Sequence, residues 1–234
     1  APGYVSLVSR GKFYQALKVI KEHLPFPSIC GRVCHRPCEN ACTRKEIDEP
    51  VGIAQIKRFV GDFELEIPIA KTPPIDTRAE KVAIIGGGPA GLTAANDLAL
   101  LGYHVSIFEE MPVLGGMMRF GIPTFRLPKE ILEKEITDVT NLGIRIFLNM
   151  KVGREITIKE IMERGYRAVF LAIGAQKGKK SGLETESLEG VFQSIEFLKD
   201  LNLGVIKTTP IASISSEICF GCGLCMEECP YETI

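Results

Sequence analysis

The chain has 234 residues, of which 45% are hydrophobic and 24% charged, and its formal net charge is −1. This length predicts one or two domains, and the balanced charge gives no indication of a nucleic-acid-binding protein. No apolar run reaches the roughly 18 residues of a membrane span, and the first residues lack the basic region, apolar core and cleavage site of a signal peptide. We therefore expect a cytoplasmic protein without a membrane span.

The first predicted element is an amphipathic helix over residues 10–24, in which apolar residues recur at helical spacing. The sequence PFP should end it. A second short helix is predicted from Gly52 to about residue 65, and residues 71–78 read as a linker. The N-terminal part should therefore be a small helical domain.

Between these two helices lies the first of two cysteine groups, Cys30, Cys34, Cys38 and Cys42. Clustered cysteines in a sequence without a secretion signal favour metal or iron–sulfur ligation over disulfide bonds. Structural zinc sites favour two C-x2-C pairs that are separated by a longer loop. Four thiolates within thirteen residues therefore predict a compact iron–sulfur cluster, with zinc as the alternative.

The next stretch carries a glycine-rich turn. Residues 81–85 predict a buried parallel strand, and Gly86, Gly88 and Gly91 follow in G-x-G-x-x-G spacing at the start of an apolar helical run that reaches Leu101. In this spacing the glycines allow a sharp turn, close approach of the backbone to a pyrophosphate, and tight packing of the helix on the strand. A dinucleotide site is predicted, and a purely structural turn is the alternative.

A second strand, over residues 104–110, carries an acidic residue at a matching position. Glu109 follows Gly86 by twenty-three residues, where a carboxylate can accept hydrogen bonds from a ribose. Residues 111–128 then form an extended loop with Gly115 and Gly116, which a simple NAD-binding domain would not need.

The remaining pattern alternates helix and strand. Residues 129–142 predict an amphipathic helix with one apolar face formed by Leu132, Ile136, Val139 and Leu142. A strand over 144–152, a short helix over 155–165 and a strand over 166–175 follow. The fold class is therefore α/β, with a Rossmann-type domain behind the helical one.

These residues resemble a known family. The GGGPAG turn, Glu109, the glycine pair and RFGIPTFRLPKE are similar to the FAD-binding half of the glutamate synthase small subunit, a family that includes the N-terminal part of dihydropyrimidine dehydrogenase. The GRVC-x-x-PCE-x-x-C stretch from Gly31 to Cys42 is similar to the iron–sulfur domain of that family. In the family this stretch joins an earlier cysteine group to hold two [4Fe–4S] clusters. The sequence starts after the place of that group, so we expect an incomplete ligand set.

The resemblance implies FAD rather than a nicotinamide in the first site. Two features carry this implication: the extended loop and the FLAIGA stretch, which looks like a second flavin signature. Val152 would meet the adenine through its backbone, although ordinary core roles remain the alternative for Val152 and Ala172. The implied FAD-binding residues are Gly86, Gly88, Pro89, Ala90, Gly91, Glu109, Gly115, Gly116, Arg119, Val152, Ala172 and Gly174.

The C-terminal stretch carries the second cysteine group. Cys219, Cys222, Cys225 and Cys229 stand in the C-x2-C-x2-C-x3-C-P spacing of ferredoxins, which predicts a [4Fe–4S] cluster closed by all four. The stretch also resembles the ferredoxin insert in the FAD-containing component of heterodisulfide reductase. We expect domains at 1–78 (helical iron–sulfur), 79–204 (FAD-binding) and 205–234 (ferredoxin-like).

The NADPH domain that the family inserts after its FAD half is missing from this sequence, and no second G-x-G-x-x-G occurs. We expect that a domain has been removed near Gly204 and Val205, with a natural deletion as the alternative. The site for NAD(P)H is therefore not visible, although NAD(P)H is an expected cofactor.

The combination predicts an FAD-dependent iron–sulfur oxidoreductase. Flavin exchanges two electrons as a hydride and releases them singly, whereas iron–sulfur clusters carry one electron at a time. We expect an electron-transfer subunit that works with other iron–sulfur or oxidoreductase subunits, electron bifurcation being one form of this role. No catalytic side chain is predicted. The alternatives are the NADPH-oxidising small subunit of a glutamate synthase and a non-catalytic iron–sulfur scaffold.

Overall fold

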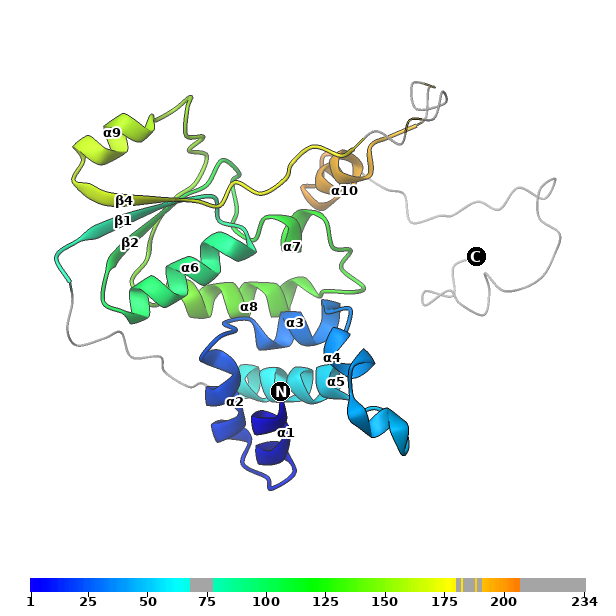
Figure 1. Ribbon diagram of the computed structural model, residues 1–234. Coiled ribbons are helices and arrows are strands. Elements are labelled where there is room, and N and C mark those ends of the chain that lie inside the picture. The colour runs from blue at the N-terminus through cyan, green and yellow to red at the C-terminus, as the bar shows by residue number, and fades with distance from the viewer. Residues whose placement is uncertain (68–77, 180–181, 183–187, 189–190, 207–234) are drawn as a thin grey trace.

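The computed structural model describes residues 1–67, 78–179, 182, 188 and 191–206. Figure 1 shows a group of helices stacked below a parallel sheet that has helices on both faces. The second cysteine group and nearly all of the predicted linker lie outside the described residues. Within the described ranges, no helix is both long and apolar enough to cross a membrane.

The N-terminal part is helical, as predicted. The helices expected over 10–24 and from Gly52 are confirmed as α2 (Phe13–Lys21) and α5 (Ile53–Glu66), the first shorter than expected at both ends. Four further elements were not predicted, because runs of four to seven residues show too little periodicity. They are α1 (Pro2–Val8), α3 (Pro27–Val33), α4 (Pro37–Asn40) and the 3-10 helix η1 (Thr43–Glu46).

Two glycines let α3 and α5 approach each other closely. A Cβ atom on Gly61 would lie 2.5 Å from the backbone nitrogen of Ser28, and one on Gly31 would lie 2.6 Å from the Cα atom of Arg58. Arg32 and the Ser28 hydroxyl both bond to Asp62, so polar contacts fasten the same pair of helices. The helix that carries Cys30 is thus held along its length by α5.

The sheet contains four parallel strands in the order β3-β2-β1-β4. They are β1 (Lys81–Ile85), β2 (His104–Phe108), β3 (Arg145–Phe147) and β4 (Tyr166–Leu171). All four predicted strands are confirmed, but β3 has only three residues and β4 ends before Ala172. At the end of the strand predicted over 144–152, Val152 makes an isolated bridge with Ile156.

Helices cover both faces of the sheet (Figure 1). One face packs against α6 (Pro89–Leu100) and α8 (Lys129–Thr140), and the other against α9 (Ile158–Glu163). All three were predicted, and the expected apolar face of α8 is buried. The short α7 (Met117–Phe120), inside the expected loop, and α10 (Ser194–Asn202), which contacts α7, were not predicted.

One apolar core spans both parts of the chain. Phe26 and Ile29, at the start of α3, are buried in the same cluster as Ile84 of β1, Leu92 of α6 and Ile136 of α8. Burying apolar surface across this boundary stabilises the contact between the helical part and the Rossmann-type part. The cysteine-bearing α3 therefore lies directly against the sheet domain.

Candidate functional site

The glycine-rich turn connects β1 to α6 at the carboxyl edge of the sheet. Gly86 has a φ of +105°, and a Cβ atom there would lie 2.4 Å from the carbonyl oxygen of Ala172. A Cβ atom on Gly91 would lie 1.9 Å from the carbonyl oxygen of Gly86. Both positions therefore need glycine, one for its backbone conformation and both for the space between β1, β4 and α6.

The glycine pair of the following loop lies against this turn. The Gly115 N–H donates to the carbonyl oxygen of Gly87 at 2.8 Å. Gly116 has a φ of +50°, and a Cβ atom on it would lie 2.7 Å from the Cα atom of Gly88. The fold thus brings together two glycine segments separated by twenty-seven residues of sequence, and the surface they form is almost entirely backbone.

This surface fits a pyrophosphate. α6 begins at Pro89, so the N–H groups of Ala90 and Gly91 come before the first acceptor that their own helix provides. A Cβ atom on Gly88 would have only Gly116 within 4 Å, at 3.7 Å, so space is open at this position. Free N–H groups and the positive end of the α6 dipole suit an anion there.

Glu109 lies at the end of β2 and is 7% exposed. Its Oε2 atom accepts the Gly87 N–H at 2.6 Å, and its Oε1 atom accepts the Met111 N–H at 2.8 Å. The carboxylate thus braces the glycine turn and the loop after β2. Each carboxylate oxygen has a second lone pair, so acceptance of ribose hydroxyls remains a prediction.

Three other predicted FAD residues contribute no backbone to the glycine turn, although the Arg119 N–H donates to the carbonyl oxygen of Gly116 at 3.0 Å. Arg119 of α7 donates to the carbonyl oxygen of Leu114 and pairs with Glu133 of α8, and this bond holds the pKa of Glu133 below its usual range. Val152 packs on the α9 face of the sheet, and Gly174, with a φ of +67°, follows the end of β4. Their contact with FAD remains a prediction.

The first cysteine group is spread over several short elements. Cys30 lies in α3, Cys34 follows its end, Cys38 lies in α4 and Cys42 precedes η1. Throughout the described part of the chain, no three His, Cys, Asp or Glu residues are close enough together to hold a metal ion. Closure of one cluster by these four thiolates therefore remains a prediction, as does sharing with ligands outside this sequence.

The environments of these thiols differ. Burial raises the pKa of Cys30, whereas a backbone hydrogen bond from Val51 lowers the pKa of Cys42. Burial, together with the nearby Cys38 and Cys34, raises the pKa of Tyr4 to about 12. Tyr4 of α1 therefore lies near Cys34 and Cys38. A soft thiolate donor set suits iron–sulfur chemistry.

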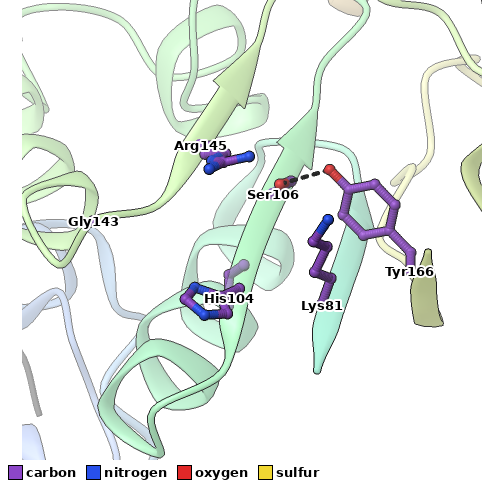
Figure 2. Close-up of a pocket in the computed structure, with 7 residues that line it drawn as sticks. Lys81, His104, Ser106, Gly143, Arg145 and Tyr166 are labelled. Atoms are coloured by element: carbon purple, nitrogen blue, oxygen red, sulfur yellow. Dashed lines mark hydrogen bonds between the residues drawn. The ribbon is translucent and has the colours of Figure 1, made fainter. Parts of the chain in front are cut away.

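A separate cavity of about 110 Å³ lies at the opposite edge of the sheet, near the amino ends of the strands (Figure 2). The Tyr166 hydroxyl and the Ser106 Oγ are 2.8 Å apart within it. Ligands of open parallel sheets bind outside the carboxyl ends of the strands. We therefore expect the nucleotide at the glycine turn and not in this cavity. The residues lining the cavity are Lys81, His104, Val105, Ser106, Gly143, Arg145 and Tyr166.

Sequence reasoning missed Glu135, a 1% exposed carboxylate on α8 that bonds to the start of α3. A signal was present, since Glu135 follows Leu132 by three residues and precedes Ile136, which places a charge on the apolar face.

Comparison with known proteins identifies all three parts of the chain. Residues 80–216 match the pyridine nucleotide-disulphide oxidoreductase family. Residues 1–68 match the dihydropyrimidine dehydrogenase domain II, 4Fe-4S cluster family, and residues 212–234 match the 4Fe-4S binding domain family. These matches confirm the predicted fold class and the expected FAD, NAD(P)H and [4Fe–4S] cofactors.

Curated relatives agree with these family matches. The NADP(+)-dependent formate dehydrogenase subunit beta of Moorella thermoacetica is 39% identical over 86% of this chain and 32% of its own length. The NADPH-Fe(3+) oxidoreductase subunit beta of Geobacter sulfurreducens is 37% identical over 87% of the chain and 31% of its own length. The glutamate synthase [NADPH] small chain of Escherichia coli is 34% identical over 84% of this chain and 42% of its own length.

The chain spans about a third of the length of the first two relatives. These names and the family matches confirm both the prediction of an oxidoreductase and the resemblance to the small chain of glutamate synthase. The chain therefore belongs to the pyridine nucleotide-disulphide oxidoreductase family.

Proposed function

We propose that this chain carries electrons between NAD(P)H and [4Fe–4S] clusters by way of FAD, as part of a larger cytoplasmic oxidoreductase complex. The proposal is supported most by the shared core, in which Ile29, next to Cys30, packs with Leu92 and Ile84 beside the glycine turn. Short, rigid contact between a flavin domain and a cysteine-bearing helix suits electron transfer within one molecule.

In this proposal the chain holds and orients the flavin. FAD supplies the exchange of a hydride on one side and of single electrons on the other. The N–H groups of Gly88, Ala90 and Gly91 bind its pyrophosphate, and Gly116 closes over them. Glu109 accepts from the ribose while it braces Gly87. The remaining proposed contacts are Gly86, Pro89, Gly115, Arg119, Val152, Ala172 and Gly174.

The proposed cluster ligands are the eight cysteines. Cys30, Cys34, Cys38 and Cys42 belong to the helical domain, proposed to extend over 1–78. Cys219, Cys222, Cys225 and Cys229 belong to a ferredoxin-like segment over 205–234, behind an FAD domain over 79–204. Partner subunits with iron–sulfur centres or reductase activity would receive or supply the electrons, and the names of the relatives as subunits support this.

Anaerobic addition of NADH or NADPH to the purified complex tests the proposal. We expect loss of the flavin absorbance followed by reduction of the clusters. As a control, Gly88→Phe should lack FAD because its side chain occupies the pyrophosphate position, yet keep its iron. Stable oxidised flavin in the presence of both nucleotides would contradict the proposal.

A second candidate is the small subunit of a glutamate synthase, which the E. coli relative favours. Glutamine-dependent formation of glutamate with a large partner subunit would single it out. A scaffold role predicts instead that clusters are present but are not reduced through the flavin.

A further inference from the structure

Glu135 connects α8 of the FAD domain to α3 of the iron–sulfur domain. Its side chain is 1% exposed. The Oε1 atom accepts the Ser28 N–H at 2.8 Å, and the Oε2 atom accepts the Ile29 N–H at 2.9 Å. Because each oxygen accepts one backbone N–H, the contact fixes the orientation as well as the distance of the two helices.

α3 does not satisfy these two N–H groups itself. Its N-cap residue is Phe26, which has no side-chain acceptor, and Pro27 occupies the first position. The N–H groups of Ser28 and Ile29 belong to the first turn, where a helix provides no acceptors of its own. A carboxylate more than a hundred residues later in the sequence therefore satisfies them.

Charged side chains of α2, α5 and α8 surround the contact between Glu135 and α3, and we call this region the junction. Lys21 of α2 pairs with Glu64 of α5 and lies 3.7 Å from Asp138 of α8. Lys21 and Glu64 are the charged side chains that act on Glu135 from the packed helices. The junction therefore combines one buried carboxylate, one bridging lysine and the apolar side chains of Phe26 and Ile29.

We propose that Glu135 is a positioning residue that sets the location of Cys30 relative to the flavin. Ile29, whose N–H binds Glu135, is the residue directly before Cys30. Releasing the start of α3 would let the cysteine-bearing segment shift, although neither the flavin turn nor any cysteine would be changed. This inference rests on the proposed function, because it assigns the junction a role in electron transfer between FAD and an iron–sulfur cluster.

Hydrogen exchange of the full complex tests whether Glu135 fixes the start of α3. In the wild-type protein the peptide 27–33 should be protected at Ser28 and Ile29, unlike a free helix start. In Glu135→Gln, which keeps the size but turns an amide NH2 toward one of the two N–H groups, exchange there should be about ten- to a hundredfold faster. Rapid exchange already in the wild type would overturn the inference without relying on any variant.

The matched control is Glu130→Gln, which changes the same residue type on an exposed position of α8. It should leave exchange of the peptide unchanged. Both variants should keep wild-type iron and FAD contents, which shows that they fold. Equal exchange in Glu135→Gln and the control would overturn the inference.

The role of Glu135 in electron transfer is tested by measuring the rate at which photoreduced flavin reduces the clusters in a single turnover. We expect Glu135→Gln to slow this step by about tenfold or more, since small displacements from a productive geometry have such effects. A wild-type rate in a variant with faster exchange would overturn the positioning role while the proposed function stands. No transfer in the wild type would reject the proposed function, and the exchange experiment would still decide whether Glu135 fixes α3.

Discussion

At the scale of single residues, the proposed flavin site consists of backbone more than of side chains. Gly116 lies against Gly88 with a φ of +50°, and Glu109 uses both carboxylate oxygens to hold backbone N–H groups. The sequence predicted the glycine turn, and the fold brings Glu109 and Gly116 against it. The sequence could not predict that Glu109 braces the turn, because this contact depends on the path of the loop that follows β2.

Gly116→Ala tests the contact between the two glycine segments. A methyl group would lie 2.7 Å from the Cα atom of Gly88, and the left-handed backbone would add strain of about 1–3 kcal/mol. We expect FAD content after purification to fall by about tenfold or more while iron content is unchanged. Gly3→Ala, whose methyl group meets only Val19 at 3.7 Å, is the control and should bind FAD normally. Full flavin occupancy in Gly116→Ala would show that this segment does not close over the site.

Glu135 also predicts a pH dependence of stability. Burial raises its pKa from 4.5 to about 7, against the effect of the N–H groups of Ile29 and Ser28, which favour the anion. The folded state then binds the proton more tightly than the unfolded state. The contribution of Glu135 to the free energy of unfolding is therefore complete below pH 4.5. It is lost as the pH rises through 7, and the free energy of unfolding falls by up to about 3 kcal/mol.

The measurement is the apparent midpoint of thermal unfolding between pH 5 and pH 8. It should fall with rising pH more steeply in the wild type than in Glu135→Gln, in which this group cannot titrate. Lys21, Glu64 and Asp138 remain in both proteins, so the comparison isolates the residue at position 135. Parallel pH profiles would mean that Glu135 is ionised at all these pH values.

At the scale of elements, amphipathic periodicity predicted the longer helices correctly and missed the short ones. α5 and α8 carry enough turns for an apolar face to be visible in sequence. α3 and α4 do not. Pro27, at the start of α3, was read only as part of the PFP sequence that ends the preceding helix, and Pro37, at the start of α4, was not read as a helix start. These short helices position Cys30 and Cys38, so the arrangement of the cysteines could not be deduced from their spacing.

Gly61→Leu tests the packing of α3 on α5. Its Cβ atom would lie 2.5 Å from the backbone nitrogen of Ser28, so the helices must separate. We expect destabilisation by about 1–3 kcal/mol or more, because overpacked cores lose this much. Thermal unfolding of the protein, followed by the helical signal, should show this destabilisation. Gly52→Ala, where a Cβ atom meets only the flexible side chain of Gln55 at 3.3 Å, should be nearly neutral. An unchanged midpoint in Gly61→Leu would contradict the close packing.

At the scale of the whole molecule, the alternation of strand and helix predicted the parallel sheet and its α/β class. The glycine spacing also located the turn at the carboxyl edge. The contact of α3 with α8 was not predictable, because it joins residues more than a hundred positions apart that share no motif. Glu135 places a charge on the apolar face of α8, but only the folded arrangement shows what it binds.

Cys222→Ser tests the C-terminal ferredoxin-like segment. If the four cysteines close one cluster, the variant should lose about four iron atoms per chain and keep its FAD. Iron and flavin assays of the purified protein provide both values. Unchanged iron content would show that Cys222 does not ligate a cluster.

In the proposed function, electrons pass within this chain from FAD to an iron–sulfur cluster. Rapid freezing after anaerobic mixing with NADPH or NADH, followed by electron paramagnetic resonance, tests it most directly. We predict loss of the oxidised flavin first and then the signal of reduced [4Fe–4S] clusters, formed at the rate at which the reduced flavin is reoxidised. Reduced flavin that persists beside oxidised clusters, in a protein with full iron content, would show that electrons do not pass from FAD to the clusters.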